Sequence, residues 1–135
     1  MNGICLNDRS GYSLWLWWIN NEVQCLSETR RQQIESAEVI AVSAISCFEI
    51  AWLERRKRIC LSCQATEWFE KALNNSGIIL LPITPAIAVA AVDLHEHHSD
   101  PQDRLIIATA LEHNANLMSD DDKFAKYSEL KGRLL

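Results

Sequence analysis

The stretch EVIAVSAISCFEIAWLERRKR, residues 38–58, decides the fold. Its first six residues, 38–43, are rich in Ile and Val and show no polar–apolar alternation, which indicates a strand covered on both faces. Ser43 or Ser46 can cap a following helix that reaches about Arg58, because apolar side chains then recur at helical spacing. A buried strand that leads directly into a helix predicts an α/β fold with a parallel sheet.

Further short apolar segments and helical patterns flank this unit. The strands are predicted at 3–6, 77–83 and 115–119. The helices are predicted at 14–20, at 27–37, after a cap at Thr66, after Thr84 and Pro85, and from Asp100 to Asn114. This order predicts a three-layer α/β/α sandwich with a mainly parallel sheet of four to five strands. Right-handed crossovers then place the strand-to-helix turns at one edge of the sheet.

The composition indicates a single domain over residues 1–135. A net charge of −5 argues against nucleic-acid binding by bulk attraction, but not against an enzyme that meets phosphates through metal ions. The start of the chain lacks signal-peptide features, and the apolar run 14–19 is too short to span a bilayer. Five irregularly spaced cysteines predict reduced thiols in the cytoplasm, with Cys60 and Cys63 structural rather than zinc-binding or redox-active.

Acidic residues follow the predicted strands at the same edge of the sheet. Asp8 follows the first strand, Glu49 lies on the first or second turn of the helix after the second, and Asp103 lies on the first turn of the helix before the fourth. The segment SDDD, residues 119–122, follows the fourth strand directly. Taken singly, each acid has a structural explanation, as a residue of a solvated helix face, of a first helical turn or of a turn. Ligand sites in parallel sheets, however, form at this edge. Converging carboxylates require a cation, and their hard oxygen atoms suit Mg²⁺ or Mn²⁺ better than zinc.

Four segments in a fixed order carry a family resemblance. They are LWLWWIN (14–20), VSAISCFEIAWLERRKRI (42–59), ILLPITPAIAVAAVDL (79–94) and SDPQDRLIIATALEHNANLMSDDDKF (99–124). They contain the patterns S-x-x-S-x-x-E-I, D-P-x-D-R-L-I-x-A-T-A and L-x-S-x-D-D-K. With these segments, which cover most of its length, the chain resembles PIN domains, specifically the VapC-like ribonuclease toxins of bacterial toxin–antitoxin pairs.

The resemblance implies a catalytic and metal-binding set and a supporting set. The catalytic acids, which would hold Mg²⁺ or Mn²⁺ for hydrolysis of RNA phosphodiester bonds, are Asp8, Glu49, Asp103 and Asp121. The supporting residues are Asp100, Ser119, Asp122 and Arg104, of which Arg104 either contacts substrate or pairs with a nearby acid. The resemblance also implies a cognate antitoxin protein that blocks the site, and we expect a homodimer without membrane association.

The N-terminal segment departs from the family pattern. Counting back from the Trp-rich segment in the family spacing leads to Gly11, not to an acid, and Asp8 is the nearest candidate. Either a longer loop lets Asp8 reach the metal, or a primary ligand is missing. The alternative function is therefore a catalytically degenerate PIN fold that acts as a protein-binding module.

Three other features of the sequence each allow two interpretations. The run 54–58 either complements the helix end or holds RNA phosphates. His95, His97 and His98 fit a solvated loop better than a zinc site, because their spacing is irregular. The Trp residues of 15–18 divide between the core and a groove for an antitoxin helix or a dimer partner.

Overall fold

The computed structural model describes residues 3–7, 15, 26–74, 76–94, 100–119 and 122–135. Four parallel strands form one sheet in the order β3-β2-β1-β4. The strands are β1 (Gly3–Leu6), β2 (Val39–Ser43), β3 (Ile78–Leu81) and β4 (Asn116–Met118). The predicted strand positions and the predicted parallel sheet are confirmed.

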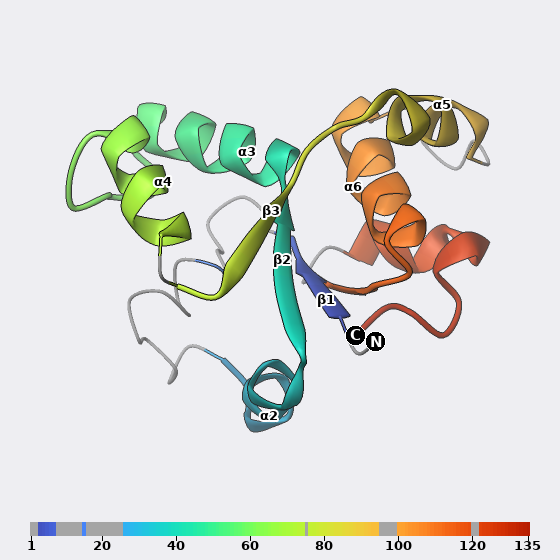
Figure 1. The fold of residues 1–135 in the computed structure, drawn as a ribbon. Coiled ribbons are helices and arrows are strands. Elements are labelled where there is room, and N and C mark those ends of the chain that lie inside the picture. Colours follow the sequence, from blue (N-terminus) through green and yellow to red (C-terminus); the bar gives the residue numbers. More distant parts are fainter. Residues whose placement is uncertain (1–2, 8–14, 16–25, 75, 95–99, 120–121) are drawn as a thin grey trace.

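Helices cover both faces of this sheet (Figure 1). They are α2 (Glu28–Ser36), α3 (Ala44–Arg55), α4 (Ala65–Leu73), α5 (Pro85–Asp93) and α6 (Pro101–Glu112), followed by the 3₁₀ helices η2 (Asp122–Lys126) and η3 (Ser128–Leu130). The chain adds β2 and β3 on one side of β1 and then returns across the sheet to β4 on the other. Crossovers of one hand therefore place α2, α3 and α4 on one face and α5 and α6 on the other, as the three-layer prediction requires.

Alternate residues of the strands pack into two separate cores. Ile4 and Leu6 of β1 pack with side chains of α2, α3 and α4, together with the fully buried Trp15. Cys5 faces the opposite way and packs with α6 and the C-terminal 3₁₀ helices. Full burial of each large apolar side chain contributes about 1.5–3 kcal/mol, so both helical layers are held firmly against the sheet.

Of the two residues that the sequence offers as caps of α3, Ser43 is the cap. The Ser43 Oγ atom accepts a hydrogen bond from the Ile45 N–H at 3.2 Å, whereas Ser46 lies inside the helix and is buried. The helix ends at Arg55, earlier than the predicted Arg58, because Lys57 adopts a left-handed backbone with φ of 61°.

The prediction that Thr66 caps α4 is wrong. The cap position is Gln64, whose side chain makes no capping hydrogen bond, and Thr66 is the second residue of the helix. The packing of Trp68 and Ala72, one turn apart, fixes the position of α4 on the sheet, so burial sets its start rather than a cap.

Helices α5 and α6 begin as the sequence predicts. Thr84 and Asp100 cap them with their side chains, and each is followed by a proline at the first helical position. Asn114, with φ of 53°, follows His113, the C-cap residue of α6. Among the described residues no helix has the length and apolar character needed to cross a bilayer.

Candidate active site

The candidate site lies where β1 and β4 end side by side. This is the point at which the chain switches direction across the sheet, and such points form crevices at the carboxyl ends of parallel strands. Asn7, directly after β1, donates its backbone N–H to Met118 O at 3.0 Å and its Nδ2–H to Ser119 Oγ at 3.1 Å. Asn7 and Ser119 are 3 % and 7 % exposed, so this contact ties the two strand ends together in a buried position.

Glu49 reaches the same edge of the sheet from α3. The helix begins directly after β2, which places Glu49 in its second turn, close to the end of that strand. The residue is half-buried, and its Oε2 atom is shielded from solvent. Helix α3 also contacts α6, the helix that carries Asp103.

Asp103 lies in the first turn of α6 and is 6 % exposed. The Asp100 Oδ1 atom accepts hydrogen bonds from the N–H of Gln102 at 2.9 Å and of Asp103 at 3.5 Å, which fixes this turn. A buried carboxylate is retained in a fold only where positive charge or donors offset its desolvation. The buried position of Asp103 therefore marks it as a functional candidate rather than an ordinary first-turn acid.

Two cationic side chains border the acids. Lys123 Nζ lies 3.5 Å from Asp103 Oδ2 and comes from η2, directly after the predicted Asp121 and Asp122. Arg30 donates from Nη2 to the main-chain oxygen of Ser119 at 2.9 Å, and so reaches the end of β4 from α2. Sequence reasoning missed Arg30, and its position in the first turn of the helix before β2 is a signal too weak to have found it.

Arg104 reaches toward α5. Its guanidinium donates to the main-chain oxygens of Ala91 at 2.9 Å, Val92 at 3.1 Å and Leu94 at 2.6 Å. These oxygens belong to the C-terminal end of α5, where carbonyl groups have no hydrogen-bond donor within the helix. Arg104 supplies the missing donors and thereby holds α5 against α6. Arg104 also contacts the buried Tyr127, whose phenol pKa is raised by burial and lowered in part by the nearby guanidinium.

Several predicted site residues fall outside the described part of the chain. Asp8 and Asp121 are among them, and Asp122 is described only as the first residue of η2. His95, His97 and His98, for which the sequence favours a solvated loop, also lie outside the described residues. Within the described ranges no three Asp, Glu, His or Cys side chains group closely enough to hold a metal ion. The described donors are hard oxygens, from the carboxylates of Glu49 and Asp103 and the Asn7 amide, and this donor chemistry fits Mg²⁺ or Mn²⁺.

Comparisons with known proteins identify a family for the sequence and known structures with the same fold. The PIN domain family model matches residues 13–130. Ribonuclease VapC22 of Mycobacterium tuberculosis is 39 % identical over 112 residues, which are 82 % of this chain and 84 % of that protein. VapBC2 from Rickettsia felis, solved bound to a DNA fragment from its promoter, matches with a TM-score of 0.67 at 16 % identity, over 98 % of this chain and 97 % of that one. DNA-bound VapBC from Salmonella typhimurium matches with a TM-score of 0.61 at 15 % identity, over 100 % of this chain and 98 % of that one. The two structural matches show a shared fold.

Proposed function

The chain belongs to the PIN-domain family, and from this premise we propose that its acidic edge binds Mg²⁺ or Mn²⁺ and hydrolyses RNA phosphodiester bonds. Its likeness to Ribonuclease VapC22 makes it a ribonuclease toxin of the VapC type. Our proposal adds the divalent cation and the four acids that would hold it, Asp8, Glu49, Asp103 and Asp121.

One observation carries the proposal: Asp103 is a buried carboxylate at the ligand-binding edge of a parallel sheet. Asp103 and Glu49 would hold the cation, with Asp8 and Asp121 completing the set. A bound divalent ion supplies a more acidic water and neutralises phosphate charge. The chain's own part is to hold these carboxylates on fixed turns, through the Asp100 cap on α6 and the Ser43 cap on α3.

The test compares two glutamates of the same helix. We expect the purified chain to cleave RNA with Mg²⁺ or Mn²⁺ and to stop when EDTA is added. Glu49→Gln should lower the cleavage rate about 100-fold or more, because several kcal/mol of charge stabilisation is lost. Glu54→Gln, five residues along α3, should retain the wild-type rate. Cleavage at the same rate by wild type and Glu49→Gln would refute the proposal.

The degenerate binding module remains the second candidate, because the predicted first acid Asp8 is displaced in the sequence. Calorimetric titration with Mn²⁺ separates the two functions. No binding at millimolar Mn²⁺ would favour the module, and saturable binding that Glu49→Gln weakens would favour the nuclease.

We further propose an antitoxin protein as the partner that blocks the site, and a homodimer. The relatives of known structure include a toxin–antitoxin complex from Klebsiella pneumoniae, which supports a partner of this class. We keep the cytoplasm as the proposed location, since Cys60 and Cys63 are thiols rather than a disulfide.

Exposed apolar side chains on α3 and α5 support the homodimer. Phe48 and Trp52 are each 49 % exposed and stack with their ring centroids 5.8 Å apart. Val89 and Val92 lie one turn apart on α5 and are 62 % and 77 % exposed. Exposed apolar pairs of this kind favour a protein interface. Light scattering should show a dimer that becomes monomeric in the double variant Val89→Glu/Val92→Glu, and a monomeric wild type would contradict the proposed dimer.

A further inference from the structure

Asn7 occupies the central position of the sheet edge. It directly follows β1, which lies between β2 and β4, and it is 3 % exposed. The backbone hydrogen bond from Asn7 N to Met118 O continues the β1–β4 pairing by one residue. The direction of the Asn7 side chain is therefore set by the sheet itself rather than by a loop.

The two ends of the Asn7 amide have different surroundings. The Nδ2 atom donates to Ser119 Oγ at 3.1 Å. The Oδ1 atom is buried and accepts no hydrogen bond from any residue that the structure describes. In a planar amide the oxygen and nitrogen diverge from one carbon, so the bond to Ser119 turns Oδ1 away from that hydroxyl.

A structural cross-link explains only half of this arrangement. The Asn7–Ser119 bond joins two strand ends and accounts for the amide nitrogen. A buried carbonyl oxygen without a donor costs free energy, and such groups in native proteins call for an explanation such as an ion. On the same edge of the sheet, Glu49 and Asp103 are carboxylates of the proposed cation site.

We propose that Asn7 Oδ1 is the ligand that the end of β1 contributes to the cation, an amide oxygen in the place where a carboxylate would bind more strongly. The inference rests on the proposed function and deepens it. Amide carbonyl oxygens are suitable ligands for Mg²⁺ and Mn²⁺, but they bring no charge. Because affinity for such ions follows the charge of the ligands, the site binds a divalent cation more weakly than the same site with aspartate at position 7.

This inference changes the role expected for Asp8. With Asn7 as the ligand, the neighbouring Asp8 need not reach the cation. The family spacing that leads to Gly11 is then explained by a longer segment between β1 and the Trp-rich stretch. In the sequence, Asn7 is marked only by its position directly after the predicted strand 3–6, because its side chain is neutral.

The experiment measures Mn²⁺ binding to the full chain by calorimetry and by the loss of the free Mn²⁺ signal in electron paramagnetic resonance. Asn7→Asp should tighten the Kd for Mn²⁺ about tenfold or more, while the Ser119 hydroxyl can turn and donate to the new carboxylate. Asn7→Leu, of similar size, should weaken binding about tenfold or more, and the control Glu54→Gln on α3 should leave the Kd within about twofold of wild type. Circular dichroism melting identifies variants that fail to fold, and Asn7→Asp alone decides the matter if Asn7→Leu is one of them.

The variant Glu49→Gln distinguishes a failure of the Asn7 assignment from a failure of the proposed function. If Glu49→Gln abolishes Mn²⁺ binding while Asn7→Asp leaves it unchanged or weaker, the assignment of Asn7 is overturned and the proposed metal site stands. If Glu49→Gln leaves the Kd unchanged, the proposed function itself fails.

Discussion

Helices α2 and α6 begin with the same local signals and use them differently. Ser27 caps α2 by accepting from the Arg30 N–H at 3.2 Å, and Glu28 is the acid of its first turn. Asp100 caps α6, and Asp103 is the acid of that first turn. Each acid complements the positive end of its helix, so local rules alone treat the two helix starts as equivalent.

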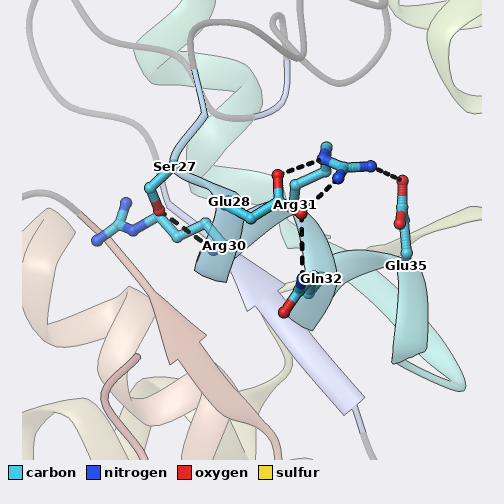
Figure 2. Close-up of polar contacts among 6 residues, drawn as sticks. All are labelled: Ser27, Glu28, Arg30, Arg31, Gln32 and Glu35. Carbon is cyan, nitrogen blue, oxygen red and sulfur yellow. Dashed lines mark hydrogen bonds and ion pairs between the residues drawn. The ribbon is translucent and has the colours of Figure 1, made fainter.

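The difference between the two acids lies in burial and in the origin of their partners. The Glu28 side chain is 64 % exposed and pairs within its own helix, with Arg31 at 2.6 Å and Gln32 at 3.0 Å (Figure 2). The Asp103 side chain is 8 % exposed and pairs with Lys123, twenty residues along the chain. Figure 2 also shows Arg30 pointing away from the Glu28–Arg31–Glu35 pairs, so on α2 a cation rather than an acid reaches toward β4. Tertiary position, not helix-start chemistry, decides which acid can serve a site.

Neutralising each acid should give the largest contrast. Asp103→Asn removes a buried charge from the proposed cation site, and RNA cleavage with Mg²⁺ should fall about 100-fold or more. Glu28→Gln removes an exposed charge with partners on its own helix, and the cleavage rate should stay within about twofold of wild type. Initial rates on a fluorescent RNA, measured at saturating Mg²⁺, give both values. Equal losses in the two variants would remove the distinction between the helix starts.

Removing one arginine from each helix, Arg104 from α6 and Arg31 from α2, should give the largest contrast in stability. Arg104→Ala leaves three main-chain oxygens at the end of α5 without their charged donor, and the free energy of unfolding should fall by about 2–3 kcal/mol. Arg31→Ala breaks only exposed pairs within α2, and its effect should be far smaller. Urea unfolding followed by tryptophan fluorescence measures both. A loss from Arg31→Ala as large as that from Arg104→Ala would show that the surface pairs matter as much as the buried contacts.

Removing the two caps should have similar costs in stability and different costs in function. Asp100→Ala and Ser27→Ala should each lower the free energy of unfolding by about 1 kcal/mol, the usual contribution of a side-chain cap. Asp100→Ala should also weaken Mn²⁺ binding, because the turn that holds Asp103 is loosened, whereas Ser27→Ala should not. Asp100→Ser restores a cap and should recover both properties. Unchanged Mn²⁺ affinity in Asp100→Ala would mean that the cap plays no part in positioning Asp103.

The contrast also explains what the sequence could predict. The apolar strands, the Ser43, Thr84 and Asp100 caps and the order of the elements within the described residues depend on local rules, and the structure confirms them. The same rules failed at Thr66, where the burial of Trp68 sets the helix position instead.

For the candidate site, the sequence could predict that the acids share one sheet edge, because a parallel sheet fixes that edge. It could not predict that Arg104 binds the end of α5, since this depends on how two helices pack. Nor could it reveal the buried amide oxygen of Asn7, because neutral residues carry no charge pattern. The roles of Asp8 and Asp121 stay predictions.

The smallest expected effect concerns the pH dependence of the α2 network. Hydrogen bonding and charge from Arg31, with a further bond from Gln32, hold the pKa of the Glu28 carboxyl below its ordinary value of 4.5. The folded state therefore binds this proton less tightly than the unfolded state, so the contribution of Glu28 is present above pH 4.5. It is lost as the pH falls below that value through the lower pKa of the folded state. Wild type and Glu28→Gln should differ slightly in thermal midpoint at pH 7 and low salt, and their midpoints should converge under acid or in 1 M NaCl, because the pair is exposed and screened. A difference that persisted in acid would show that Glu28 acts through packing rather than through its charge, and the exposed helix start would then resemble the buried one more than its geometry indicates.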